Sequence, residues 1–281
     1  MKIYDKGIFE GERALYNVEF SEIKNSVFKN GESPLKECRG LKIKSSVFEW
    51  KYPLWYCEDI IAEDTVLLGT ARSGIWYTDG VTITRCTVDA PKTFRRCKGV
   101  KIEATSMFNA EETLWSCDNV DIKDVNVRGD YFGMNSTNVK AYNFCVSGNY
   151  LFDGGKNIFI ENAKLVSKDA FWNCENVTVK DSVIIGEYLA WNSKNVKFIN
   201  CDIESNQGLC YMDGVVLENC RLINTDLAFE FSRVDASFTA TAVSVKNPIE
   251  GRIIADKIDE IIMDPALVDV SKTEIIADEK D

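Results

Sequence analysis

The sequence contains no histidine among its 281 residues. That absence excludes the Ser-His-Asp and Cys-His mechanisms of nucleophilic catalysis, and every zinc site that needs a histidine ligand. Carboxylate, lysine, arginine and tyrosine side chains remain as groups that could carry chemistry. We therefore predict no metal centre and no cofactor, and we expect any enzymatic activity to depend on carboxylates.

Positive charge and long apolar runs are also scarce. The formal net charge is -11, and no run of lysine or arginine is longer than two residues, so a phosphate backbone or an anionic lipid surface would be repelled at long range. Residues 1–15 contain acids and glycines where a signal peptide needs an apolar run, and no stretch reaches the length of a transmembrane helix. We expect neither nucleic acid nor a membrane as a partner, and a cytoplasmic location.

A repeat of about 19 residues runs through most of the chain. Its anchor column is Cys38, Cys57, Thr78, Cys97, Cys117, Ser136, Gly155, Cys174, Ser193, Met212 and Phe231. The steps are 19, 21, 19 and 20 residues, and then 19 throughout. Five of the ten cysteines lie in this column. Because no Cys-x-x-Cys pair occurs and small apolar side chains fit a corner of a core, we predict reduced, buried cysteines.

Two apolar columns follow each anchor with the alternation of a half-buried strand. Three residues past the anchors stand Leu41, Ile60, Val81, Val100, Val120, Val139, Ile158, Val177, Val196, Val215 and Val234. A further inward column lies ten residues past the anchors and includes Phe48, Leu67, Val88, Met107 and Val127. Repeats of helical hairpins need longer periods, and the leucine-rich spacing is missing. The pattern predicts a solenoid of parallel strands.

Residues that tolerate a left-handed backbone precede the first apolar column, which indicates a tight bend. Five consecutive turns carry asparagine there, namely Asn119, Asn138, Asn157, Asn176 and Asn195. Such side chains would stack about 4.8 Å apart and could hydrogen-bond to one another. We predict an all-β, single-stranded, right-handed parallel β-helix of about twelve turns over residues 1–245, with residues 1–13 as its N-terminal cap. Residues 246–281 are predicted to form C-terminal strands, a cap and an acidic tail.

The turns GERALY, GESPLKE, WKYPLWY, GIWYTDG, KTFRRC, ETLWSC, GDYFGMNS, GNYLFDGGKN, KDAFWNC and GEYLAWNS resemble those of a bacterial family catalogued as domain of unknown function 3737. The resemblance covers nearly the whole chain. It implies a pectin-lyase-like β-helix, and it transfers no activity and no site residue.

The segment before each anchor carries the candidate site. Six residues before the anchors stand Glu12, Glu32, Lys51, Arg72, Pro91, Glu111, Asp130, Asn149, Lys168 and Glu187. Beside them lie Tyr52, Tyr131, Tyr150 and Tyr188, and the column two before the anchors holds Trp55, Trp76, Trp115, Trp172 and Trp191. We call these residues the aromatic–acidic stripe, because equal positions in successive turns lie in line along a solenoid.

Rings flanked by charge are typical of sugar-binding surfaces, where flat rings pack on pyranose faces and carboxylates bind hydroxyls. We predict an oligosaccharide ligand. The predicted substrate-binding residues are Trp55, Trp76, Trp115, Trp172, Trp191, Tyr131, Tyr150 and Arg72. The alternative interpretation is structural: the tryptophans pack against neighbouring turns, and opposite charges such as Lys168 and Glu187 form cross-strand pairs.

The predicted catalytic residues are Glu111, Asp130, Lys168 and Glu187. Glu111 and Asp130 occupy consecutive turns, so each is expected to raise the pKa of the other, as in a carboxylate-dependent glycoside hydrolase. A polysaccharide-lyase-like reaction would instead use Lys168 or Arg72 as the base. Calcium for such a reaction needs a cluster of three acids on neighbouring turns, which the sequence does not show. A non-catalytic scaffold, with the stripe as a protein-binding face or a homo-oligomer contact, is the other hypothesis.

Overall fold

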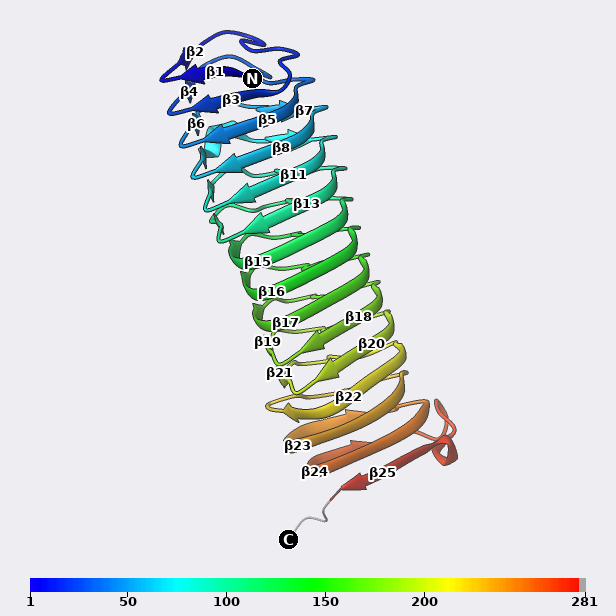
Figure 1. The fold of residues 1–281 in the computed structure, drawn as a ribbon. Coiled ribbons are helices and arrows are strands. Elements are labelled where there is room, and N and C mark those ends of the chain that lie inside the picture. The colour runs from blue at the N-terminus through cyan, green and yellow to red at the C-terminus, as the bar shows by residue number, and fades with distance from the viewer. Residues whose placement is uncertain (278–281) are drawn as a thin grey trace. The chain divides into compact units, whose positions relative to one another are not determined.

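The computed structural model describes residues 1–277, and the C-terminal end of the predicted acidic tail, residues 278–281, lies outside this range. The chain falls into two compact units, Met1–Cys145 and Val146–Asp281. We call them unit 1 and unit 2 and describe each by itself. Figure 1 labels many of the strands of both units.

Unit 1 is a stack of coils whose strands pair in parallel, each with the equivalent strand of the next turn. The main ladder consists of β1 (Lys2–Asp5), β3 (Ser21–Lys24), β5 (Arg39–Lys44), β8 (Glu58–Glu63), β11 (Asp79–Thr84), β13 (Lys98–Glu103) and β15 (Asp118–Arg128). A second ladder consists of β2 (Ile8–Phe9), β4 (Val27–Phe28), β6 (Val47–Phe48), β9 (Val66–Leu67), β12 (Thr87–Val88), β14 (Ser106–Met107) and the end of β15. The strands β7 (Leu54–Trp55) and β10 (Ile75–Trp76) form a short third pair, and η1 (Gly69–Ala71) is a single 3-10 turn.

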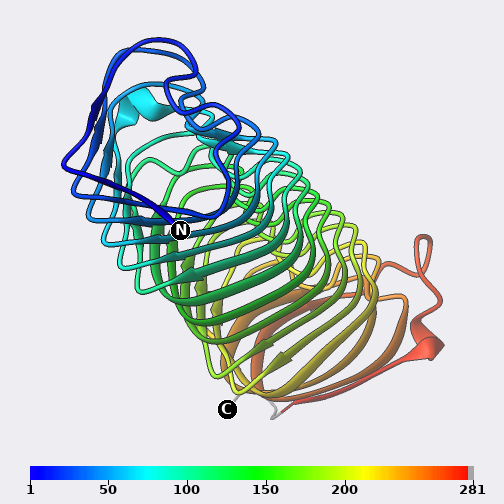
Figure 2. The same ribbon diagram turned by 45° about the horizontal axis from the view of Figure 1, so that its top comes forward.

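Unit 2 repeats the arrangement. Its main ladder is β17 (Lys156–Val166), β18 (Glu175–Lys180), β20 (Lys194–Ile199), β22 (Asp213–Leu222), β23 (Arg233–Lys246), β24 (Glu250–Ile262) and β25 (Thr273–Ala277). The second ladder runs from β17 through β19 (Val183–Ile185) and β21 (Asp202–Glu204) to β22. The loop between β24 and β25, which contains η2 (Val270–Lys272), projects from the coil in Figure 2. β16 (Thr137–Ser147) spans the division between the units.

The register confirms the predicted apolar columns. In unit 1, Val81 lies beside Ile60 and Val100, and in unit 2, Val177 lies beside Ile158 and Val196. All six side chains are buried. Each inward residue is therefore enclosed by its own column above and below, which is why the column three residues past the anchors contains only leucine, isoleucine and valine.

The predicted right-handed parallel β-helix is confirmed, but with about 15 turns instead of about twelve. The additional turns come from both ends of the chain. β1, within residues 1–13, pairs with β3 along four residues and is the first turn of the coil. β24 and β25 continue the parallel ladder of unit 2 beyond residue 245.

The asparagine ladder forms in unit 2 and is altered in unit 1. In unit 2, Asn176 donates to Asn157 at 3.0 Å and Asn195 donates to Asn176 at 3.1 Å. In unit 1, Asn119 and Asn138 both donate to the Asp118 carboxylate, at 3.1 and 2.7 Å. Hydrogen bonds from Thr137 and Asn138 lower the pKa of Asp118. The five-membered ladder was therefore predicted too simply, because an ionised neighbour is a stronger acceptor than an amide oxygen.

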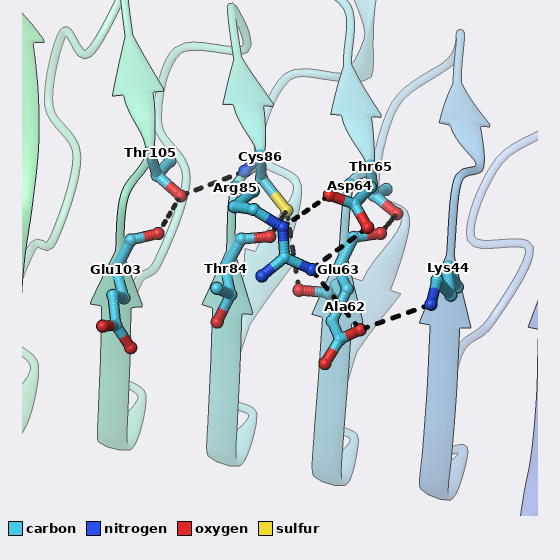
Figure 3. Close-up of polar contacts among 10 residues, drawn as sticks. All are labelled: Lys44, Ala62, Glu63, Asp64, Thr65, Thr84, Arg85, Cys86, Glu103 and Thr105. Atoms are coloured by element: carbon cyan, nitrogen blue, oxygen red, sulfur yellow. Dashed lines mark hydrogen bonds and ion pairs between the residues drawn. The ribbon is translucent and has the colours of Figure 1, made fainter.

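Small hydroxyl and thiol side chains link successive turns at the bends, as Figure 3 shows for one bend of unit 1. The Thr105 hydroxyl accepts a hydrogen bond from the Cys86 backbone amide at 3.2 Å and donates to the Glu103 carbonyl at 2.8 Å. On the outer surface, the Arg85 guanidinium binds the Asp64 carboxylate through two hydrogen bonds of 2.7 and 3.1 Å. Bends that turn away from the regular ladder thus still satisfy their backbone polar groups.

The predicted core role of the anchor cysteines is confirmed, since Cys38, Cys57, Cys97, Cys117 and Cys174 are all buried. Nine of the ten cysteines are buried, and Cys145 is exposed. Burial raises the pKa of Cys57, Cys174 and Cys210 to about 12. A thiol reagent needs an accessible thiolate. We therefore expect a colorimetric disulfide reagent to titrate one thiol per native chain at pH 8 and ten after denaturation; rapid reaction of several native thiols would contradict this core.

Candidate functional site

The tryptophan column of the stripe is half-buried, and its rings stack on one another. Trp55 and Trp76 are parallel to within 7°, with centroids 4.9 Å apart, and Trp172 and Trp191 are parallel to within 13° at 5.8 Å. Indole N–H groups fix this arrangement: Trp76 donates to a backbone carbonyl of the next turn at 2.8 Å, and Trp172 does so at 2.9 Å. Because neighbouring rings cover these faces, the edges of the indoles are what a ligand could reach.

Arg95 interrupts the column in unit 1 and replaces a ring with a cation. Its guanidinium carbon lies 5.1 Å from the Trp76 centroid and 4.8 Å from the Trp115 centroid, in the geometry of a cation–π contact. Arg95 also forms an ion pair with Glu112, which Lys92 approaches to 3.3 Å. The Trp column is therefore packed from turn to turn, as in the structural interpretation of the sequence. Its predicted role in substrate binding stays a prediction.

Glu111 and Asp130 do lie on adjacent turns of unit 1, as predicted. The backbone amide of Glu112 donates to the Asp130 carbonyl at 2.9 Å. A Cβ atom on Gly129 would lie 2.6 Å from the Ala110 backbone, so the close approach of these turns requires glycine there. Both carboxylate residues are exposed. The nearby Tyr131 ring is 6.5 Å from that of Trp115.

Lys168 and Glu187, also predicted as catalytic, form an ion pair of 3.2 Å between adjacent turns of unit 2. A Cβ atom on Gly186 would lie 2.0 Å from the Ser167 carbonyl oxygen, so glycine again permits the approach. The Lys168 ammonium also lies 5.1 Å from the Tyr188 ring centroid. The hydrogen bond to Glu187 raises the pKa of Lys168, which keeps this side chain a cation.

Asp169 is a residue that the sequence patterns did not single out. It is 2% exposed, and its backbone has a left-handed φ of 57°. Its amide donates to the Glu187 carbonyl at 2.9 Å, and the Tyr150 hydroxyl hydrogen-bonds to its carboxylate. Burial raises the pKa of Asp169, and the Glu187 carboxylate adds to the increase; Lys168 and the bond from Tyr150 oppose it. Asp169 stands in the column that also holds Tyr52, Tyr131, Tyr150 and Tyr188, but Glu112 stands there too, so its position in the sequence gave no signal of a buried carboxylate.

These groups form one constellation in unit 2. The Tyr150 ring contacts Trp172 edge to face at 6.1 Å, and Tyr188 contacts Trp191 at 5.4 Å. We call the constellation the Asp169 cluster: Tyr150, Lys168, Asp169, Trp172, Glu187 and Tyr188. It combines a buried carboxyl group, a lysine–carboxylate pair, two phenols and an indole. In such a set Asp169 can supply a proton, Lys168 can keep the Glu187 carboxylate charged, and the aromatic rings can contact a ring-shaped ligand.

A hollow of about 380 Å³ lies on the stripe in unit 1, lined by Trp50, Lys51, Gly69, Thr70 and Arg72. It occurs where the repeat step is 21 residues, and the additional residues form the 3-10 turn η1, coloured cyan in Figure 2. The Thr70 hydroxyl donates to the Glu49 carbonyl and so fastens this turn to the one before it. Of these residues, Arg72 was predicted for binding, whereas Trp50 lies outside every column and was missed.

The remaining predicted positions extend along the same segments. In unit 1 the Lys51 ammonium is 2.7 Å from the Glu32 carboxylate, a cross-strand pair. No group of three or more Cys, Asp or Glu side chains that could hold a metal ion occurs within residues 1–277. Over the same described range, no helix has the length and apolar character to span a bilayer.

Solved structures that resemble the chain are distant in sequence. The surface adhesin PfbA of Streptococcus pneumoniae is 10% identical over 84% of this chain and 70% of its own, with a TM-score of 0.36. The A-module of the mannuronan C-5 epimerase of Azotobacter vinelandii is 12% identical over 99% and 90%, with a TM-score of 0.33. Tailspike protein 3 of bacteriophage CBA120 is 11% identical over 100% and 55%, with a TM-score of 0.36. TM-scores this low carry no functional weight.

No curated protein matches the sequence. One family model does match, and it covers residues 2–276. This extent agrees with the resemblance that the turn motifs carry along the chain. The chain therefore belongs to the family described as "Protein of unknown function (DUF3737)".

Proposed function

We propose that the chain binds an oligosaccharide along the aromatic–acidic stripe and processes it by acid–base chemistry at the Asp169 cluster. The observation that carries the proposal is the buried carboxyl group of Asp169, held by Tyr150 beside the ion pair of Lys168 and Glu187. A buried acid next to a charged carboxylate is the arrangement that separates proton donor from base or nucleophile in glycoside cleavage.

In this proposal, Asp169 donates a proton to the leaving oxygen because its raised pKa keeps it protonated to a higher pH than an exposed aspartate. Glu187, which the Lys168 ammonium keeps charged, is the carboxylate that acts as base or nucleophile. The phenol of Tyr150 positions Asp169. The edges of Trp172 and Trp191 supply apolar contact to the sugar rings, and Glu111 and Asp130 remain a second carboxylate pair, in unit 1.

A titration of intrinsic tryptophan fluorescence with a panel of neutral and acidic oligosaccharides tests binding. We expect at least one member to change the emission at millimolar concentration. A Trp172→Phe variant should lose most of the change, because the Trp172 ring contacts Tyr150 in the Asp169 cluster. Absence of any response from the unsubstituted protein to every panel member would refute the binding surface, and release of reducing ends measures processing.

A non-catalytic scaffold is the second candidate function, and the stacked indoles favour it. Rings whose faces are covered by neighbouring turns stabilise the coil without any ligand. Under this hypothesis the exposed edges form a protein contact, including a contact between two copies of the chain. Light scattering separates the two: an oligomer that becomes a monomer when Trp172 and Trp191 are changed to alanine supports the scaffold, and an unchanged monomer removes self-association through these rings.

A further inference from the structure

We propose that the hollow at Trp50, Lys51 and Arg72 binds the carboxylate of an acidic sugar unit, so that the ligand is a short oligosaccharide that contains a uronic acid. This inference rests on the proposed saccharide-binding function and specifies its ligand class. It concerns unit 1 alone and does not depend on the chemistry at the Asp169 cluster.

Two cations occupy adjacent turns of the stripe at this point. Along the column six residues before the anchors, Glu32 and Lys51 form a 2.7 Å pair on adjacent turns. Arg72 occupies the next turn, as its carbonyl accepts a hydrogen bond from the Tyr52 amide at 3.2 Å. Two cations therefore follow one another, and like charges on adjacent strands repel. Within residues 1–277, Arg72 has no ion pair, although it is exposed and the chain has a net charge of -11.

The surroundings of Arg72 fit a ring that carries a carboxylate. The hollow of about 380 Å³ is in the lower part of the roughly 300–1,000 Å³ range of small-molecule sites. Trp50 lines it and is 36% exposed. The Lys51 ammonium is 5.9 Å from the Trp50 ring centroid, and no aromatic ring stacks on Trp50 in the described part of the chain. This indole thus differs from the stacked column, because its exposed surface is free to contact a sugar.

The choice of a carboxylate follows from the cations and from the whole chain. A guanidinium binds a carboxylate through two parallel hydrogen bonds, and Arg72 can offer both, whereas the neighbouring Lys51 ammonium is already paired with Glu32. A long polyanion would be repelled by the net charge of -11. A short ligand with one or a few negative charges avoids that repulsion and still fills the gap beside Arg72.

Calorimetric titration of the full chain tests the inference with matched pairs of disaccharides, glucuronate against glucose and galacturonate against galactose, and with inorganic sulfate and phosphate. We expect at least one acidic disaccharide to bind about tenfold or more tightly than its neutral partner, since a charged hydrogen bond contributes this much. Arg72→Gln should abolish the preference. Arg128→Gln, which removes another exposed guanidinium from unit 1, should leave it unchanged, and Trp50→Ala should weaken both members of a pair.

Each other outcome overturns the inference in a distinguishable way. Equal binding of acidic and neutral disaccharides, or a preference that survives Arg72→Gln, removes the carboxylate site and leaves the proposed saccharide function standing. Sulfate or phosphate binding as tightly as the uronate, with no effect of Trp50→Ala, identifies a general anion site. Failure of every saccharide to bind removes both proposals.

Discussion

Replacement of Asp169 by asparagine is expected to reduce saccharide turnover by about 100-fold or more, without destabilising the fold at neutral pH. The loss follows because an amide cannot donate the proton that the proposed mechanism requires, and a positioned acid contributes roughly 10²–10⁴-fold. Binding should persist, because Tyr150 can donate to the amide oxygen as it does to the carboxylate. The expected separation of binding from turnover identifies a chemical role.

The stability part of this prediction has a definite sign. The pKa of Asp169 is raised in the folded chain, chiefly by burial. The native state therefore binds the proton more tightly than the unfolded state, whose carboxyl pKa is about 3.9. Folding is favoured below the unfolded pKa, and that contribution is lost as pH rises through the native pKa. Asparagine avoids this loss and also tolerates the left-handed φ of 57°.

Urea unfolding at pH 4 and pH 7, together with turnover assays, measures both effects. The Asp169→Asn variant should be as stable as the wild type or more stable at pH 7, with the advantage smaller at pH 4. Asp153→Asn is the matched control, because the Asp153 charge raises the pKa of Asp169. Its removal should move the alkaline limb of the pH–rate profile to lower pH and preserve the maximal activity. Full turnover by Asp169→Asn would show that another group donates the proton.

The regular part of the fold could be predicted because burial inside a coil is strict. A polar residue at Val100 or Val177 would face the apolar column on both sides, so these positions keep their character turn after turn. The bends could be predicted equally well, because asparagine tolerates a left-handed backbone. Asn176 and Asn195 adopt φ values of 59° and 51°. The columns in the sequence correspond to lines in space within each unit.

The irregular turns could not be counted, because their strands change register. Between β22 and β23 the register shifts from Leu217 to Cys220, and between β23 and β24 it shifts from Phe238 to Thr241. Each register shift changes the number of residues per turn, although the parallel pairing of the strands continues. Periodicity therefore stopped near residue 245, although β24 and β25 are further turns of unit 2.

The site was predictable in composition and position, but the exposure of individual groups was not. The sequence places Trp172 and Trp191 in one column, yet ring torsions decide whether their faces are open or stacked. In the same way, Lys168 and Asp169 are neighbours in the chain, and only packing makes one exposed and the other buried. Column position determines which turn a side chain belongs to, whereas its solvent exposure depends on neighbours in three dimensions.

Gly251→Ala is expected to lower the free energy of unfolding by about 3 kcal/mol or more, as is typical of a substitution that a packed site cannot absorb. A Cβ atom on Gly251 would lie 1.8 Å from the Val234 carbonyl oxygen, which belongs to the paired strand β23. The backbone cannot retain that register, so β24 must move away from β23. Ile253 and Ile258, both buried, would then reach solvent.

Gly214→Ala is the matched control for this clash. Gly214 has a left-handed φ of 88°, but its added Cβ atom would approach no atom closer than 3.6 Å, so its cost should be limited to the backbone strain of about 1 kcal/mol. Hydrogen exchange then locates the damage. Because solenoid turns contact only their neighbours, Gly251→Ala should deprotect the amides of β24 and β25 while β18 and β20 keep their protection. Equal protection of β24 in both variants would mean that its pairing with β23 is not what holds the last turns in place.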